Sequence, residues 1–127
     1  MTGGSGNGVV LVVDDEPAIR LLCRVNLELD GYVVLEAATL DEARARLEDA
    51  DVDVVLLDVH LGGQTSHPLI AECAVRSPRV PVAVVTGSAD LDSAALSGAD
   101  AVLPKPFAIE QLTATVDRLA TERAAAR

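Results

Sequence analysis

Short apolar runs alternate along the chain with longer stretches in which apolar residues recur at helical spacing. The runs are three to six residues long and rich in valine and leucine, which is typical of strands buried on both faces of a parallel sheet. They predict five strands, at residues 9–13, 32–35, 52–57, 80–85 and 101–103. Because each parallel strand needs a crossover before the next, the alternation predicts an α/β sheet with a helix after every strand.

The stretch after the first run predicts a helix with clear end signals. Pro17 is acceptable in its first turn, and Gly31 is expected to end it as a C-cap. The spacing predicts an amphipathic helix whose apolar face lies toward the core. That face is expected to hold Ala18, Leu22, Val25 and Leu29, with Arg20, Arg24 and Glu28 on another face.

The remaining helices are predicted from signals that differ in clarity. Thr39 and Glu42 match a capping box, in which a hydroxyl and a carboxylate satisfy backbone donors at a helix start. A polar loop around Gly62 and Gly63 precedes a short helix at residues 68–75. A short, weak helix is predicted at residues 91–96. The last helix has a clear apolar stripe, formed by Ile109, Leu112, Val116 and Leu119.

These elements predict one domain of 127 residues. Five strand and helix units in so short a chain favour a doubly wound, flavodoxin-like (βα)5 fold over a (β/α)8 barrel, which takes about 250 residues. The expected strand order is 2-1-3-4-5. Residues 9–121 form the domain, residues 1–8 a flexible glycine-rich tail, and residues 122–127 a tail or an extension of the last helix.

Charge and composition narrow the classes of partner. The net charge of −10 disfavours contact with nucleic acid or an anionic membrane, and with one tyrosine and one phenylalanine a base-stacking surface is unsupported. No apolar run approaches the roughly 20 residues that span a bilayer, and no signal peptide is recognisable, so we expect a soluble cytoplasmic protein. Cys23 and Cys73 fall inside predicted helices and are expected to be reduced core thiols.

Three aspartates directly follow two of the predicted strands. Asp14 and Asp15 follow the first strand, and Asp58 follows the third. Each alone is compatible with an ordinary helix cap. In the 2-1-3-4-5 order, however, the first and third strands are neighbours, so all three carboxylates are expected in one crevice at the strand ends, where such sheets bind ligands. Crowded carboxylates need a compensating cation, and Mg²⁺ suits a few oxygen ligands.

Two further residues are predicted at the same edge. Thr86 follows the fourth strand, and Lys105 follows the fifth. Alone, Lys105 is usually a solvated charge and Thr86 an ordinary turn residue. Together they supply a cation and a hydroxyl donor beside the acidic cluster, which suits a phosphoryl group.

The segments 12–16, 54–58, 84–87 and 98–107 stand in an order and spacing that resemble the receiver domain of two-component response regulators. The resemblance implies that Asp58 accepts a phosphoryl group from a histidine kinase or phosphotransfer protein. It implies Mg²⁺ bound by Asp15, Asp58 and the backbone carbonyl of His60, with Asp14 acting mainly through a metal-bound water. It also implies that Lys105 neutralises the negative charge of the phosphoryl oxygens.

The resemblance also implies how the signal leaves the site. Thr86 moves to bond the phosphate, while the side chains of His60 and Ser88 tune the access of water. The Lys105–Pro106 peptide bond is expected to be cis. The chain is then no enzyme beyond its own phosphorylation and dephosphorylation, and no output domain is expected to follow. It would act as a monomer or weak dimer, by protein contact or phosphorelay, through residues 91–96, 101–103 and the last helix.

Three departures from the family pattern stand out. Val102 occupies a position that is usually aromatic, so the common threonine–aromatic switch is in doubt. The segment between Thr86 and Lys105 is shorter than usual, which makes the output surface atypical. Leu61, Gly62 and Gly63 replace an apolar residue followed by proline, which suggests a more mobile loop.

Three other functions compete with the receiver interpretation. A receiver-shaped binding module that does not use phosphorylation is the strongest of them, because the aromatic residue is missing. A phosphatase of the haloacid dehalogenase type needs a second aspartate two residues after its nucleophile, where this chain has His60. A flavodoxin-like redox protein needs an anion site after the first strand, which Asp14, Asp15 and Glu16 would repel.

Overall fold

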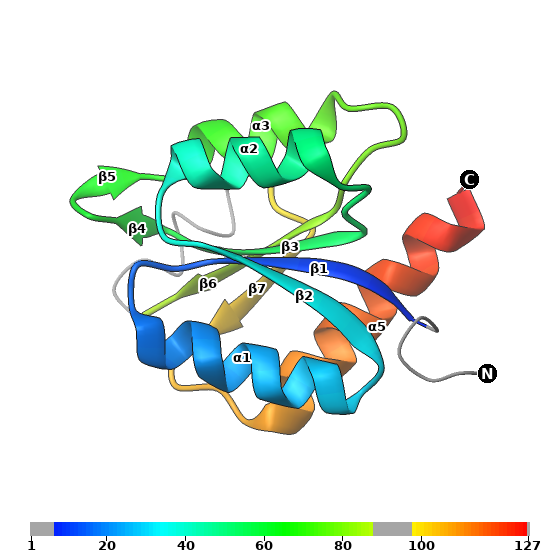
Figure 1. The fold of residues 1–127 in the computed structure, drawn as a ribbon, viewed down its shortest axis with the longest axis horizontal. Helices are drawn as coiled ribbons and strands as arrows, with labels where there is room; N and C mark the ends of the chain where they lie inside the picture. Colours follow the sequence, from blue (N-terminus) through cyan, green and yellow to red (C-terminus); the bar gives the residue numbers. More distant parts are fainter. Residues whose placement is uncertain (1–6, 88–97, 127) are drawn as a thin grey trace.

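Five apolar segments form one parallel sheet, shown in Figure 1. The structure is a computed structural model that describes residues 7–87 and 98–126. The strands are β1 (Gly8–Val13), β2 (Tyr32–Ala37), β3 (Val54–Asp58), β6 (Val82–Thr86) and β7 (Ala101–Pro104). Their order is β2-β1-β3-β6-β7, which confirms the predicted 2-1-3-4-5 topology.

Helices cover both faces of this sheet (Figure 1). On one face lie α2 (Leu40–Asp49) and α3 (His67–Ala74), and on the other α1 (Pro17–Leu29) and α5 (Ile109–Ala126). The sheet therefore has a hydrophobic core on each side, and the central strands are buried on both faces, as their continuous apolar runs predict.

Local sequence signals explain where several helices and strands begin or end. The Thr39 hydroxyl accepts the Glu42 N–H at 3.1 Å, and the Glu42 carboxylate accepts the Ala38 N–H at 2.7 Å, so a reciprocal cap starts α2. Gly31 has a φ of 89°, the left-handed conformation that ends α1. Pro81 has no N–H for the ladder, so β6 begins later than predicted.

Other boundaries also differ from the prediction. Strand β3 begins at Val54, because Val10 and Val54 form the first pair of its ladder with β1. Gly8, which we assigned to the tail, is the first residue of β1. Helix α5 continues to Ala126, so the end of the chain prolongs the last helix. The predicted helix at 91–96 and Ser88 lie outside the described residues.

The predicted inner face of α1 is wrong. Cys23 and Leu27 are buried, whereas 40% of Leu22, 46% of Val25 and 82% of Leu29 is exposed. The helix carries two apolar stripes, one at positions 18, 22, 25 and 29 and another at 19, 23 and 27. Periodicity cannot choose between two stripes, and the packing against β1 and α5 selects the second one. Helix α1 therefore presents an apolar face to solvent.

A second correction concerns the glycine-bearing segment after β3. It folds as an antiparallel hairpin of β4 (His60–Leu61) and β5 (Gln64–Thr65), where we expected a loop. Gly62 and Gly63 form the two-residue turn with φ of 54° and 85°. Two consecutive residues at positive φ are what tight hairpin turns require, and glycine adopts them without strain.

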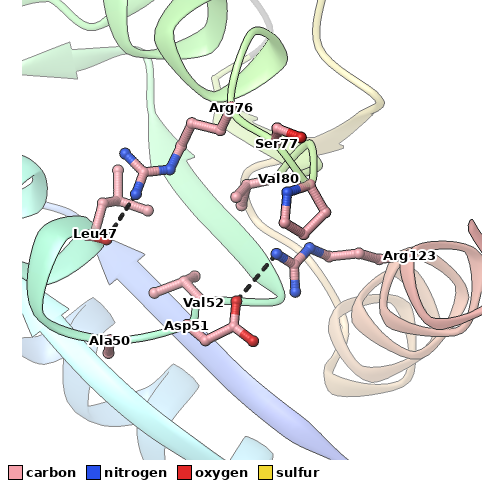
Figure 2. A pocket seen from close by; sticks show the side chains of 9 residues that line it. Leu47, Ala50, Asp51, Val52, Arg76, Ser77, Val80 and Arg123 are labelled. Atoms are coloured by element: carbon pink, nitrogen blue, oxygen red, sulfur yellow. Dashed lines mark hydrogen bonds and ion pairs between the residues drawn. The ribbon is translucent and has the colours of Figure 1, made fainter. Parts of the chain in front are cut away.

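The amino ends of the strands carry a buried ionic network. Arg123 of α5 is 6% exposed, and its guanidinium contacts Asp53 at 2.6 Å. It also contacts Asp51 at 3.2 Å, as Figure 2 shows. Its Nε also donates to the backbone carbonyl of Arg79 at 3.1 Å. Nearby, Arg76 donates to the carbonyl of Leu47 at 2.8 Å. The bonds to Asp51 and Asp53 tie the end of α5 to the segment before β3, and the Arg76 bond ties the segment after α3 to α2.

The structure bears on two expectations from the sequence, which concern the cysteines and membrane-spanning segments. Cys23 and Cys73 are free and buried, and burial raises the pKa of both thiols to about 11, so both are protonated at neutral pH. In the part of the chain that the structure describes, no helix is long and apolar enough to cross a membrane.

Candidate functional site

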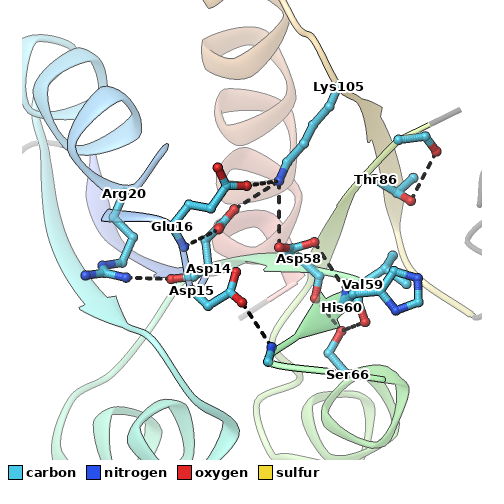
Figure 3. Close-up of polar contacts among 12 residues, drawn as sticks. Asp14, Asp15, Glu16, Arg20, Asp58, Val59, His60, Ser66, Thr86 and Lys105 are labelled. Atoms are coloured by element: carbon cyan, nitrogen blue, oxygen red, sulfur yellow. Dashed lines mark hydrogen bonds and ion pairs between the residues drawn. The ribbon is translucent and has the colours of Figure 1, made fainter. Parts of the chain in front are cut away.

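Three aspartates meet at the carboxyl edge of the sheet. Asp14 directly follows β1, Asp15 comes next, and Asp58 is the last residue of β3. One carboxylate oxygen from each lies within 4.8 Å of the others (Figure 3). Asp14 is buried, Asp58 is partly buried, and Asp15 is exposed. The predicted acidic crevice therefore exists, and it is open on the side of Asp15.

Asp14 is held at both its side chain and its backbone. Its Oδ1 accepts the Glu16 N–H at 2.9 Å, and its Oδ2 accepts from Lys105 Nζ at 3.3 Å. Arg20 of α1 donates to the Asp14 carbonyl at 2.7 Å and to Glu36 at 3.1 Å. Asp14 thus forms a local turn with Glu16 just before α1, and its orientation is fixed by Glu16, Lys105 and Arg20.

Lys105 is the cation of this cluster. Its Nζ lies 3.3 Å from Asp14, 3.7 Å from Asp58 and 3.7 Å from Glu16. Burial alone would lower the pKa of Lys105, but the carboxylates of Asp14 and Asp58 outweigh that effect and hold its pKa above its ordinary value. Lys105 therefore carries its positive charge at neutral pH.

Asp58 is less well compensated. Burial raises the pKa of its carboxyl and the charge of Asp14 raises it further, against the lowering influence of Lys105 and of the His60 N–H. The His60 N–H donates to Asp58 Oδ1 at 3.3 Å. The cluster thus holds more negative charge than one lysine balances.

Thr86 lies on the same edge. It is 2% exposed, ends β6, and pairs in register with Pro104 at the end of β7 (Figure 3). Its hydroxyl donates to the Gly87 carbonyl at 3.3 Å. Lys105 follows β7 directly, and the Lys105–Pro106 bond is cis, as the resemblance implies. Val102 is half-buried and packs against the core beneath α2 and α3.

The donor set at this edge fits a hard divalent cation. All side-chain ligands in the cluster are carboxylate oxygens, with no histidine or cysteine among them. Mg²⁺ prefers oxygen ligands, uses few carboxylates and retains waters, which an opening beside the exposed Asp15 would admit. The pKa of Asp58 is raised first by burial and then by the charge of Asp14, and a bound cation would offset both effects.

Sequence reasoning missed three contacts at the site. Arg20 was assigned to a polar helix face, although it fastens the backbone of Asp14. Ser66, which is fully buried, donates to the carbonyls of Asp58 and Val59 and fixes the end of β3. Gly62 donates its N–H to Asp15. A single sequence does not indicate which serine is buried or which backbone N–H will donate. Arg20, a cation five residues after Asp15, is a signal that the sequence does contain.

Comparison with known proteins identifies the family. The model of the response regulator receiver domain matches residues 10–117. The chain belongs to the response regulator receiver domain family. This receiver is 34% identical to the DNA-binding transcriptional regulator NtrC of Salmonella typhimurium over 114 residues, which are 87% of this chain and 24% of that protein. It is 36% identical over 120 residues to the sensor kinase CckA of Brucella abortus, covering 91% of this chain and 13% of that kinase.

Solved receiver structures have the same fold. The receiver domain protein of Clostridium thermocellum matches with a TM-score of 0.86 and 27% identity, covering 94% of this chain and 99% of that one. The receiver domain of NtrX from Brucella abortus matches with a TM-score of 0.81 and 31% identity, covering 88% and 98%. This receiver spans about a quarter of the length of the first curated relatives, so their whole-protein activities do not transfer to it.

Proposed function

We propose that this receiver accepts a phosphoryl group on Asp58 from a phosphorylated histidine of a kinase or phosphotransfer protein, and that it signals by protein contact or phosphorelay. The observation that carries the proposal is the Asp58 side chain itself. It is 12% exposed, lies 3.7 Å from Lys105 Nζ, and shares a crevice with the two other aspartates.

The transfer is a displacement at phosphorus. An oxygen of the ionised Asp58 forms a bond to phosphorus while the phosphorus–nitrogen bond of the donor breaks, and the electron pair leaves with the imidazole nitrogen. Lys105 balances charge on the phosphoryl oxygens. Mg²⁺, held by Asp15, Asp58 and the His60 carbonyl with Asp14 through water, would supply further charge neutralisation.

Thr86 is the proposed reader of the new phosphate. Its buried hydroxyl ends β6 beside Asp58 and bonds only its own loop carbonyl among the described residues, at 3.3 Å. An aspartyl phosphate brings about two negative charges and new acceptor oxygens, which favour rotation of this hydroxyl toward the site. The neighbouring Val102 offers no aromatic ring to report that movement.

Substitution of the acceptor tests the proposal directly. The purified chain is incubated with Mg²⁺ and a phosphorylated histidine kinase, and intact-protein mass spectrometry measures gain of one phosphoryl group. Asp58→Asn is expected to abolish labelling, while the exposed control Asp49→Asn is labelled like the parent. Equal labelling of Asp58→Asn would disprove the assignment.

The donor protein is proposed to dock on the exposed face of α1. Leu22 lies with Ile19, Pro106 and Phe107 around a mainly apolar depression that also includes Lys105, so this face adjoins the opening to Asp58. A protein that brings a histidine to Asp58 has to cover that opening, and burial of leucine side chains favours its binding.

A charge placed on this face separates docking from chemistry. Leu22→Glu is expected to slow phosphorylation by a protein donor at least tenfold and to leave phosphorylation by acetyl phosphate unchanged. Val75→Glu is the control, because Val75 is 84% exposed and follows α3 on the other side of the sheet. Equal rates for Leu22→Glu and Val75→Glu with the protein donor would exclude α1 as the docking face.

Val102 also supports a second candidate, a binding module that does not depend on phosphorylation. Its branched side chain cannot swing as an aromatic ring does. The two functions are distinguished by measuring partner affinity with and without beryllofluoride and Mg²⁺, which mimic the aspartyl phosphate. A change in affinity supports the phosphorylated switch, and an unchanged affinity supports the constitutive module.

A further inference from the structure

The β4–β5 hairpin turns one backbone edge toward the acidic cluster. The His60 N–H donates to Asp58 Oδ1 at 3.3 Å, and two residues later the Gly62 N–H donates to Asp15 Oδ2 at 3.0 Å (Figure 3). The intervening Leu61 pairs with the opposite strand of the hairpin. Because the backbone donors of a strand alternate between its two edges, one edge of β4 serves the hairpin and the other serves the site.

Asp15 differs from the other two aspartates in what holds its orientation. Asp14 is buried and held by Lys105, and Asp58 is partly buried and lies near the same lysine. Asp15 is exposed, and in the part of the chain that the structure describes, the Gly62 N–H is the hydrogen-bond donor to its carboxylate. With Oδ2 held by Gly62, Oδ1 remains for a metal ion.

The hairpin holds Gly62 in a defined place. Leu61 is 4% exposed and anchors β4 in the core, and the buried Ser66 bonds the end of β3 from the far end of the hairpin. A Cβ added at Gly62 or Gly63 would meet no atom within 4 Å. The two glycines therefore serve the backbone conformation of the turn, with φ of 54° and 85°, rather than a lack of space.

We propose that Gly62 is a positioning residue for the metal ligand Asp15, acting through its backbone N–H. Hydrogen bonds to metal-binding carboxylates orient them, and their loss typically costs 10–100-fold in metal affinity. The inference rests on the proposed function only in that Asp15 binds Mg²⁺. The family pattern usually has proline at this position, which has no N–H to donate, so this bond is a feature that the glycine makes available.

Replacing single backbone amides by esters tests the bond without changing a side chain. An ester at Gly62 removes the N–H that reaches Asp15, and an ester at Gly63 removes a neighbouring N–H of the same turn. By calorimetry in the absence of phosphodonor, we expect the Gly62 ester to bind Mg²⁺ about tenfold more weakly and the Gly63 ester to change less than about twofold. Equal losses, or none, would overturn the proposal, with thermal unfolding confirming that both chains fold.

Amide exchange of the unmodified protein gives a second measurement. The Gly62 amide is expected to exchange more slowly than the Gly63 amide and to stay protected in saturating Mg²⁺, because the bond persists in the metal complex. Faster exchange of Gly62 on adding Mg²⁺ would show that the metal displaces the bond, against the proposal. If both measurements succeed but Asp58 is not phosphorylated, only the proposed function fails.

Discussion

The two ends of the sheet balance charge in different ways. At the carboxyl end, Lys105 lies near three carboxylates, of Asp14, Glu16 and Asp58, and the exposed Asp15 completes an acidic excess. At the amino end, the guanidinium of Arg123 contacts two carboxylates and a backbone carbonyl. At the carboxyl end one lysine lies among four carboxylates, 3.3 Å from the nearest, whereas at the amino end the guanidinium of Arg123 bonds directly to two carboxylates.

The difference separates function from stability. The buried guanidinium of Arg123 donates to Asp53, Asp51 and the Arg79 carbonyl, and these bonds hold α5 against the segment before β3. Burial, and after it the charge of Asp14, raises the pKa of Asp58, so its ionised form costs stability until a cation binds or a phosphoryl group is added. The carboxyl end is therefore the end at which added ions should change the molecule.

Removal of the amino-end cation should have the largest effect. Arg123→Met keeps most of the buried stem but leaves Asp53 without its guanidinium partner, and we expect a loss of about 3 kcal/mol in the free energy of unfolding, as for other broken buried pairs. Urea denaturation measures it. Arg118→Met is the control, because the exposed Arg118–Glu122 pair contributes less than about 1 kcal/mol. Similar losses for both variants would remove the contrast between the two ends.

Added Mg²⁺ should act at the carboxyl end alone. A ligand at about 100 times its dissociation constant stabilises the folded state by about 2.7 kcal/mol. We expect this gain in thermal or urea unfolding for the parent chain and equally for Arg123→Met, and most of it should vanish in Asp15→Asn. A gain that survives in Asp15→Asn would place the metal elsewhere.

The sequence predicted the site edge well because that prediction needs little packing detail. A residue that follows a parallel strand lies at the carboxyl edge whatever surrounds it, so Asp14, Asp58 and Lys105 meet once the strand order is known. The order itself was expected because it is common in doubly wound sheets built from five strand and helix units. The cis bond before Pro106 came from the resemblance and not from any pattern in the residues.

The errors arose where two local patterns compete or where the partner is distant in sequence. Helix α1 carries two apolar stripes, and only contact with the sheet selects the one that includes Cys23 and Leu27. The sequence contains a hairpin signal that the loop prediction left out, because the buried Val59 and Leu61 alternate with an exposed residue before two glycines. Arg123 finds Asp53 across 70 residues, and no sequence spacing predicts that pair.

Loss of Lys105, the cation at the carboxyl end, should strengthen Mg²⁺ binding. The change should be smaller than the stabilisation that Mg²⁺ itself gives. Lys105→Met removes a positive charge that lies 3.3 Å from Asp14 and 3.7 Å from Asp58, at the edge where Mg²⁺ is proposed to bind. Relief of the repulsion between Lys105 and a divalent ion is worth about 1 to 2 kcal/mol in a water-like dielectric, so Mg²⁺ should bind roughly five- to thirtyfold more tightly by calorimetry. Phosphotransfer should nevertheless slow, since the phosphoryl oxygens lose their lysine. Weaker Mg²⁺ binding would mean that Lys105 orients the carboxylates more than it repels the metal.

The smallest expected effect concerns a second group of acidic residues at the amino end of the sheet, around Asp30. Asp30, between α1 and β2, has a raised pKa because of burial first, and then because of the charge and hydrogen bond of Asp117. Tyr32 also donates to Asp117, at 2.5 Å, so two carboxyls and a phenol meet where Arg123 does not reach. Asp30 and Asp117 therefore form a second, smaller acidic cluster.

A raised pKa makes the sign of the pH dependence definite. Asp30 contributes stability that is fully present below its ordinary pKa of 3.8 and is lost as the pH rises through its folded-state value. Asp30→Asn cannot ionise, so it should be more stable than the parent at pH 7.5 by less than about 1 kcal/mol, with the advantage shrinking as the pH falls toward 3.8. Guanidinium denaturation at several pH values, with Asp49→Asn as control, measures it. An advantage independent of pH would show that the amide acts by a new bond, and that the amino end carries no charge stress.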